Sequence, residues 1–170
     1  MSTEEKKNSQ ISLDSEILSP STEKEVSEIV REIYSKQLPI EITGTGTKKG
    51  FGYNLQTARK LTLSKLSGII DYKKEELYIK VKAGTPIQDI EKILDENNQE
   101  LAFEPIDFGY MINGQSNKGT IGGYVACNFA GSRRFKVGSV RDHILGFKGV
   151  NGKGDICLLY TSPSPRDFAI

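Results

Sequence analysis

The sequence has 170 residues, with 23 Lys and Arg against 22 Asp and Glu, which gives a formal net charge of +1 at pH 7. This balance excludes a global electrostatic attraction to nucleic acid or to an anionic membrane. No apolar run approaches the roughly 18 residues that a membrane-spanning helix needs. Two cysteines are too few for a disulfide framework, which favours a reducing compartment. The 17 glycines make up 10% of the 170 residues, above the ~7% that is usual in proteins.

The first elements in the chain are a leader, a helix and a strand. Residues 1–19 are polar, lack the pattern of a secretory signal, and are predicted to be a disordered leader. Thr22 and Glu25 have the spacing of a capping box, and apolar residues at helical spacing follow, so we predict a helix over residues 23–36. Residues 39–43 alternate and predict a short strand.

The middle of the chain predicts a strand–helix unit. Residues 61–66 indicate a strand or turn, and residues 77–83 alternate between apolar and polar side chains, as in a half-buried strand. Thr85 is the predicted N-cap of a second helix that ends near residues 97–98. A short strand is predicted at residues 101–103. This order of elements is typical of an α/β or α+β domain.

The last third of the chain contains a predicted helix at residues 121–128 and a predicted strand at residues 144–150. The string Cys157–Asp167 fits neither pattern and resembles a translated transposase adapter from short-read library preparation. The alternative is a genuine tail rich in Ser and Pro. We therefore expect residues 1–156 to be native, with residues 20–156 as the N-terminal part of a truncated domain, and residues 157–170 to be a non-native tail.

Fifteen of the glycines lie in two regions, four between Gly44 and Gly52 and eleven between Gly109 and Gly154. Residues 44–52, here called the first glycine segment, follow a predicted strand. Their backbone N–H groups, with the hydroxyls of Thr45 and Thr47 and the ammonium groups of Lys48 and Lys49, suit a phosphate. The segment is not a Walker A loop, and its third glycine comes one residue late for the dinucleotide fingerprint. The alternative is a flexible β-turn with solvated lysines.

Residues 119–123, here called the second glycine segment, read Gly-Thr-Ile-Gly-Gly and precede a predicted helix. Such a segment can bring backbone N–H groups against an anion or a flat ring, or it can simply let a helix pack closely. His143 is the only histidine and does not make a metal site alone. The basic residues between Arg133 and Arg141 are interpreted as a solvated surface, so no nucleic-acid partner is expected.

The motifs in their order resemble the FAD-binding domain of the vanillyl-alcohol oxidase/p-cresol methylhydroxylase (PCMH) type, and within it the FAD-binding subunits of bacterial glycolate oxidase. The matching stretches are Ile42–Lys48, Leu63–Ile69, Val81–Pro86, Leu101–Pro105, Gly119–Gly123, Arg141–Phe147 and Val150–Gly154. The resemblance implies an α+β fold, in which an α/β subdomain is followed by the start of a mixed α+β subdomain.

The resemblance also implies which residues bind FAD. They belong to the two glycine segments and to three positions that would line the cleft: Gly44, Thr45, Gly46, Thr47, Lys48, Pro105, Gly119, Thr120, Ile121, Gly122, Gly123, Asn128 and Gly131. Some relatives attach FAD through a histidine in the first loop. This loop has none, so noncovalent FAD is expected. Catalytic residues of the family lie in later segments, so none is assigned and the chain is expected to be inactive alone.

The function that the resemblance implies is oxidation of a 2-hydroxy acid by an FAD-dependent subunit of a glycolate oxidase complex. Its expected partners are a paralogous flavin subunit and an iron–sulfur subunit, and its expected location is the cytoplasm, with possible peripheral attachment to the inner membrane through those partners. One alternative is a subunit that binds FAD only for structure or electron relay. Another is a different flavoenzyme of this fold, such as a D-lactate dehydrogenase or a cell-wall precursor reductase.

Overall fold

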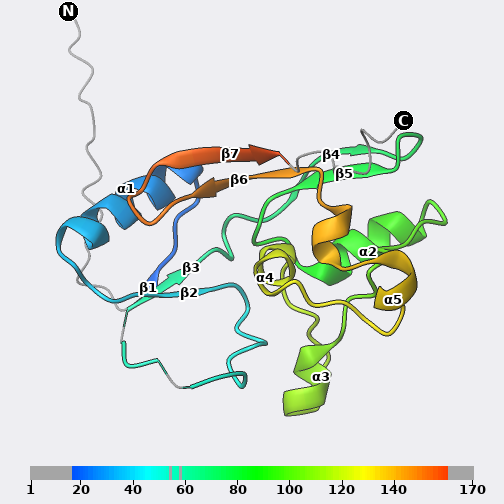
Figure 1. Ribbon diagram of the computed structural model, residues 1–170, viewed down its shortest axis with the longest axis horizontal. Coiled ribbons are helices and arrows are strands. Elements are labelled where there is room, and N and C mark those ends of the chain that lie inside the picture. The colour runs from blue at the N-terminus through cyan, green and yellow to red at the C-terminus, as the bar shows by residue number, and fades with distance from the viewer. Residues whose placement is uncertain (1–16, 54, 58, 161–170) are drawn as a thin grey trace, which may run out of the picture.

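A computed structural model describes residues 17–53, 55–57 and 59–160 (Figure 1), so the predictions for residues 1–16 and 161–170 lie outside the described part. The elements in this part are β1 (Ile17–Leu18), α1 (Glu23–Ser35), β2 (Glu41–Thr43), β3 (Lys60–Thr62), β4 (Ile69–Lys73), β5 (Tyr78–Val81), α2 (Ile87–Asp95), α3 (Phe108–Asn113), α4 (Ile121–Cys127), α5 (Arg134–Val137), the 3₁₀-helix η1 (Val140–His143), β6 (Gly146–Val150) and β7 (Ile156–Tyr160). The mixed content confirms the predicted α+β class.

The N-terminal half packs α1 against a small parallel sheet of order β1-β3-β2. The Thr22 N-cap that predicted α1 is present, since its hydroxyl accepts from the Glu25 N–H and so satisfies a donor that the first helical turn leaves open. The Glu25 carboxylate accepts from the Ser21 N–H, one residue before the N-cap. The buried core of this half comprises Leu18, Val26, Ile29, Ile33 and Leu61.

The predicted leader is too long at its C-terminal end. Ile17 and Leu18 form β1 and pair with Lys60 and Leu61 of β3. The Leu18 side chain is only 3% exposed. A two-residue strand leaves no periodic pattern in the sequence, and burial of one leucine together with its backbone pairing is what orders the segment.

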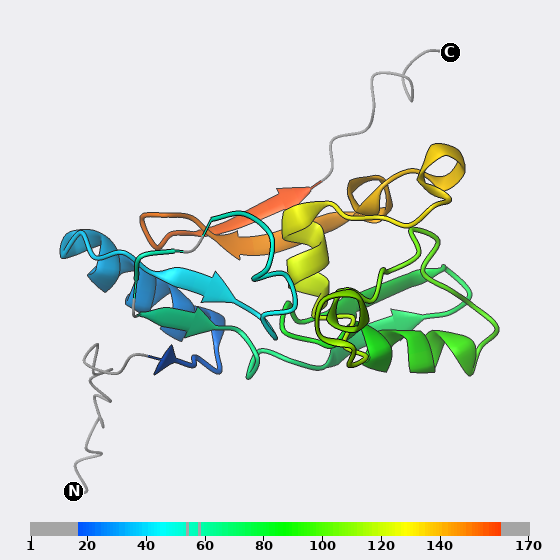
Figure 2. The ribbon, with the colours of Figure 1, turned by 90° about the horizontal axis from the view of Figure 1, so that it is seen from below.

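The second half combines the antiparallel pair β4–β5 with α2, and its core is formed by Ile87, Phe103, Phe108, Tyr124 and Val140. In Figure 2, α2 lies beside β4 and β5, and α4 faces the loop that follows β2. The predicted strand 77–83 and helix 121–128 are confirmed by β5 and α4. No helix in residues 17–53, 55–57 or 59–160 is long and apolar enough to cross a membrane.

Two local predictions in this half are wrong. Thr85 does not cap α2, because its buried hydroxyl donates to the Lys82 carbonyl at 2.6 Å and accepts from the Gly68 N–H at 3.0 Å; Pro86 stands at the N-cap. Residues 101–103 form no strand. They turn so that Phe103 enters the core, and Glu104 then takes a positive φ of 48°.

β6 confirms the predicted strand at 144–150 and pairs with β7 in an antiparallel hairpin. Figure 1 shows this hairpin running across α1, where the Ser27 hydroxyl donates to the Gly154 carbonyl at the hairpin turn. Residues 157–160 of the predicted non-native tail belong to β7. A short apolar run of any origin can pair in this way, so the predicted origin of the tail stays a prediction.

Candidate functional site

The first glycine segment leaves β2 as two tight turns that leave several donors open. The Lys49 N–H donates to the Gly46 carbonyl and the Phe51 N–H donates to the Lys48 carbonyl, while Gly46 takes a positive φ of 76°. Within the described part of the chain, none of the five backbone N–H groups from Gly44 to Lys48 donates a hydrogen bond. Consecutive unpaired N–H groups in a loop form a concavity that suits an anion.

The second glycine segment is fixed by backbone hydrogen bonds to residues 83–87. The Gly122 N–H donates to the Ala83 carbonyl at 2.9 Å, the Ile121 N–H donates to the Thr85 carbonyl at 3.0 Å, and the Ile87 N–H donates to the Gly119 carbonyl at 2.9 Å. Thr120 caps α4, with its hydroxyl 3.4 Å from the Gly123 nitrogen. Backbone hydrogen bonds therefore hold the second glycine segment firmly against the residues that lead into α2.

The two glycine segments face each other. A Cβ at Gly44 would lie 2.5 Å from the Thr120 hydroxyl oxygen, and a Cβ at Gly119 would lie 2.8 Å from that of Thr47. The Lys48 ammonium would be 3.3 Å from a Cβ at Gly119 and 3.6 Å from one at Gly123. Segments more than 70 residues apart in the sequence thus form one site, with glycine where side chains would otherwise collide.

Lys48 lies half-buried in this site above two aromatic rings. Its ammonium is 4.2 Å from the ring centroid of Tyr124 and 5.1 Å from that of Phe108, which are cation–π distances. Burial lowers the pKa of the Lys48 ammonium, and the nearby Cys127 thiol acts in the opposite direction. Lys49 differs, because it pairs with the Glu41 carboxylate at 3.2 Å.

The aromatic floor of the site is buried. The Tyr124 hydroxyl donates to the Ile106 carbonyl, and burial raises the pKa of Tyr124, with the carboxylates of Asp107 and Glu91 adding to the shift. Tyr124 therefore stays a neutral phenol. Phe51, near the end of the first glycine segment, packs edge-on against Phe108 with ring centroids 5.3 Å apart. Together with Lys48, Phe51 thus holds this segment against the aromatic rings.

Asp107 positions Phe108 at the start of α3. Its carboxylate accepts from the Tyr110 N–H, the Asn117 N–H and the Ser116 hydroxyl at 2.7–2.9 Å. Partial burial opposes ionisation, but these hydrogen bonds outweigh it and lower the pKa of Asp107. The same carboxylate thus caps α3 and closes the loop that leads to the second glycine segment.

Several predicted site residues have structural partners of their own. The N–H groups of Ile121 and Gly122 are already paired, and a Cβ at Gly122 would lie 2.8 Å from the Ala83 carbonyl oxygen. Asn128 ends α4 with a positive φ of 51°, and its side chain accepts from the Arg141 N–H. Gly131 donates its N–H to Phe103 and lies against Glu104, where a Cβ would approach to 2.6 Å.

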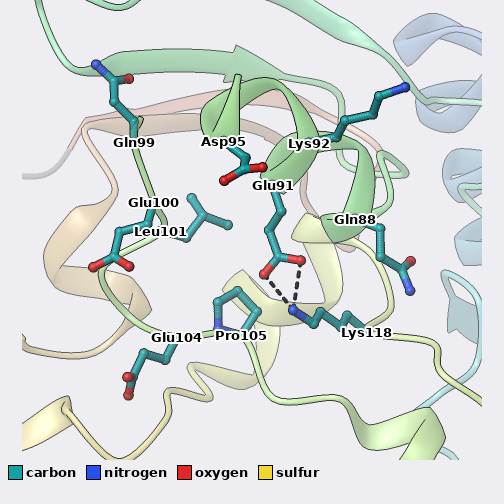
Figure 3. A pocket seen from close by; sticks show the side chains of 10 residues that line it. All are labelled: Gln88, Glu91, Lys92, Asp95, Gln99, Glu100, Leu101, Glu104, Pro105 and Lys118. Atoms are coloured by element: carbon teal, nitrogen blue, oxygen red, sulfur yellow. Dashed lines mark hydrogen bonds and ion pairs between the residues drawn. The ribbon is translucent and has the colours of Figure 1, made fainter. Parts of the chain in front are cut away.

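Pro105 lines a different place, a cavity of about 520 Å³ between α2 and the chain around residues 99–105 (Figure 3). Most of the residues that line it are polar or charged, and the Glu91 carboxylate and Lys118 ammonium form an ion pair across it at 2.7 Å. None of the residues that line this cavity belongs to either glycine segment; they are Gln88, Glu91, Lys92, Asp95, Gln99, Glu100, Leu101, Glu104, Pro105 and Lys118.

Sequence reasoning missed the residues that support the site. Ala83 and Thr85 fix the second glycine segment, and Phe108 and Tyr124 hold Lys48. Ala83 and Thr85 fall within a motif that carries the family resemblance, which was the one signal available for them. Nothing in the sequence distinguishes Lys48 from Lys49, because their difference depends on where Glu41 lies.

Comparison with known proteins gives a family and several relatives. The FAD binding domain family matches residues 15–159. Glycolate oxidase subunit GlcE of Escherichia coli K12 is 36% identical over 127 residues, which are 75% of this chain and 34% of that protein. D-lactate dehydrogenase of Anaerostipes hadrus is 28% identical over 136 residues, 79% of this chain and 27% of that protein. The chain thus spans about a third or less of these relatives.

A solved structure of similar fold is that of Phl p 4.0202, a glucose dehydrogenase, with a TM-score of 0.66 and a sequence identity of 14%. The match covers 83% of this chain and 28% of that one. At this identity the likeness shows the fold alone.

Proposed function

This chain belongs to the FAD binding domain family, and from that premise we propose that its two glycine segments hold the diphosphate of FAD without a covalent bond. The observation that carries the proposal is the row of N–H groups from Gly44 to Lys48, which have no hydrogen-bond acceptor in the described part of the chain and belong to the segment whose Thr47 and Lys48 side chains lie beside Gly119. The Thr47 hydroxyl and the Lys48 ammonium lie on the same side. These donors match the oxygen atoms and the negative charge of a diphosphate.

The residues around the site fit FAD in charge and in shape. Gly119 and Gly123 present backbone without a side chain beside Lys48, so the chain of the cofactor can pass close to the backbone. When bound, the flavin supplies hydride and electron transfer. The protein supplies binding, orientation and exclusion of water, for which the buried rings of Phe108 and Tyr124 form an apolar support. The absence of histidine from the first glycine segment supports noncovalent binding.

The chain is an FAD-binding domain of the oxidoreductase type, and we propose that the protein it belongs to oxidises a 2-hydroxy acid, with glycolate as the first candidate. The names of the two relatives support this, because glycolate and D-lactate are both 2-hydroxy acids. A role as one subunit of a complex with a paralogous flavin subunit and an iron–sulfur subunit, located in the cytoplasm or against the inner membrane through those partners, is part of the same proposal.

Binding of FAD tests the site directly. The 170-residue chain is titrated against FAD, FMN and riboflavin, and flavin fluorescence anisotropy is followed. FAD is expected to bind weakly, with a dissociation constant above about 1 µM, and more tightly than FMN or riboflavin, because FAD alone carries a diphosphate. Equal affinity for all three flavins, or no binding of FAD up to millimolar concentration by the complete polypeptide that contains this segment, would contradict the assignment.

Substrate bleaching tests the reaction. The complete polypeptide that contains this segment is loaded with FAD and mixed anaerobically with glycolate, D-lactate or, as a control, acetate, which has no hydroxyl to oxidise. Loss of the oxidised flavin absorbance with a 2-hydroxy acid but not with acetate is expected. Persistent absorbance with every 2-hydroxy acid would favour the alternative of a structural or electron-relay subunit.

A further inference from the structure

Two adjacent lysines in the first glycine segment have different surroundings. Lys49 is exposed and already has a counterion, since its ammonium pairs with the Glu41 carboxylate at 3.2 Å. Lys48 is half-buried, and no carboxylate in residues 17–53, 55–57 or 59–160 forms an ion pair with it. The same chemical group is therefore neutralised at one position and left without an anion at the next.

The surroundings of Lys48 hold it in place without supplying a negative charge. The rings of Tyr124 and Phe108 lie 4.2 and 5.1 Å from its ammonium, and both rings are buried. Tyr124 cannot serve as the counterion, because its hydroxyl donates to the Ile106 carbonyl and its pKa is raised by burial. A partly desolvated ammonium with no counterion is unfavourable until an anion arrives.

The place left for that anion lies between the two glycine segments. The Lys48 ammonium is close to Gly119 and Gly123, where a Cβ would approach to 3.3 and 3.6 Å. The open N–H groups of residues 44–48 belong to the same segment as the lysine. One anionic ligand can thus contact the backbone of the first segment, the ammonium and the open face of the second segment together.

We propose that Lys48, and not Lys49, determines the specificity of this site for a phosphoric anhydride. In this proposal, which rests on the proposed function, Lys48 supplies the countercharge that makes the site prefer a dinucleotide diphosphate over a monophosphate or an uncharged flavin. The rings of Tyr124 in α4 and Phe108 in α3 already hold this ammonium, so it is positioned for the anion before the anion binds.

The experiment uses backbone amide NMR of the 170-residue chain with three probes: inorganic pyrophosphate, inorganic orthophosphate and FAD. The variants are Lys48→Met, Lys48→Arg and, as the matched control, Lys49→Met. Pyrophosphate is expected to shift the amides of residues 44–48, Gly119 and Gly123 and to bind more tightly than orthophosphate. Lys48→Met should weaken pyrophosphate at least tenfold, as expected for loss of a charged hydrogen bond, and Lys49→Met should change it less than twofold.

The remaining arms separate the possible failures. Lys48→Arg keeps the charge and should retain most of the affinity, and its amide spectrum shows whether substitution at this position preserves the fold. Equal weakening by Lys48→Met and Lys49→Met, or equal binding of pyrophosphate and orthophosphate, would overturn the proposal. If FAD shifts the same amides equally in the unmodified chain and in Lys48→Met, the FAD site stands and the role of Lys48 is refuted. If FAD shifts neither glycine segment, the proposed function itself fails.

Discussion

Substitution of Gly119 by alanine tests whether the two glycine segments face each other. Gly114 provides a matched control. Gly119 and Gly114 both have positive φ, 87° and 70°, but a Cβ at Gly119 would lie 2.8 Å from the Thr47 hydroxyl oxygen, whereas one at Gly114 would meet nothing within 4 Å. Both substitutions impose the left-handed backbone cost of about 1–2 kcal/mol. Only Gly119→Ala also places a methyl group in the site.

The expected loss of FAD affinity in Gly119→Ala follows from the side chains that the new methyl group would displace. Thr47 is 8% exposed, so its side chain has little room to turn away, and the Lys48 ammonium lies 3.3 Å from the new Cβ. Displacing the ammonium from the ligand removes a charged hydrogen bond that contributes about 1.5–3 kcal/mol, which corresponds to a loss of FAD affinity of about tenfold or more.

The assay combines urea unfolding with FAD titration for both variants. Gly114→Ala is expected to lose stability while it keeps the FAD affinity of the unmodified chain. Gly119→Ala is expected to lose at least as much stability and about tenfold or more in FAD affinity. If the two variants bind FAD equally well, the reasoning that places the cofactor between the glycine segments is refuted.

Three further outcomes concern stability. Gly84→Ala should lower the free energy of unfolding by more than about 3 kcal/mol, because its Cβ would lie 1.9 Å from the Leu63 carbonyl oxygen; a midpoint of urea unfolding equal to that of the unmodified chain would contradict this. The folded-state pKa of Asp107 is lowered below 3.8, so its contribution to stability is complete above that value and is lost as the pH falls through the folded-state pKa. Asp107→Asn should therefore flatten the loss of stability below pH 4, and an unchanged slope would count against it. Lys48→Met should leave the free chain equally stable or more stable by up to about 1 kcal/mol, since it removes a partly buried charge without a counterion; a large destabilisation in urea would show that the cation–π contacts dominate.

The sequence predicted the features that depend on local chemistry. The N-cap Thr22 and the apolar spacing after it are local signals, so α1 could be predicted without knowledge of the rest of the chain. The density of glycine predicted two segments where the backbone approaches another group, and the structure brings these segments together. The family resemblance extended this to FAD, which the family match supports.

Predictions failed where distant parts of the chain compete for the same group. Thr85 has the sequence context of an N-cap, but a buried hydroxyl is satisfied more completely by Lys82 and Gly68. The second glycine segment left two interpretations open in the sequence, and its Gly122 N–H is paired with the distant Ala83 carbonyl; the assignment of Gly122 to the FAD site stays a prediction. The different surroundings of Lys48 and Lys49 depend on tertiary position, which a single sequence does not encode in any local pattern.

The two sides of the site are held by different kinds of contact. Backbone hydrogen bonds to residues 83–87 hold the second glycine segment, whereas the first is held mainly by the side chains of Lys48, Lys49 and Phe51. Side-chain contacts break and reform faster than a network of backbone hydrogen bonds. We therefore expect amide hydrogen exchange to be fast at residues 44–48 and slow at Ile121 and Gly122. The time for which a ligand stays bound would then depend on how often the contacts of the first glycine segment break, and not on opening of the whole domain.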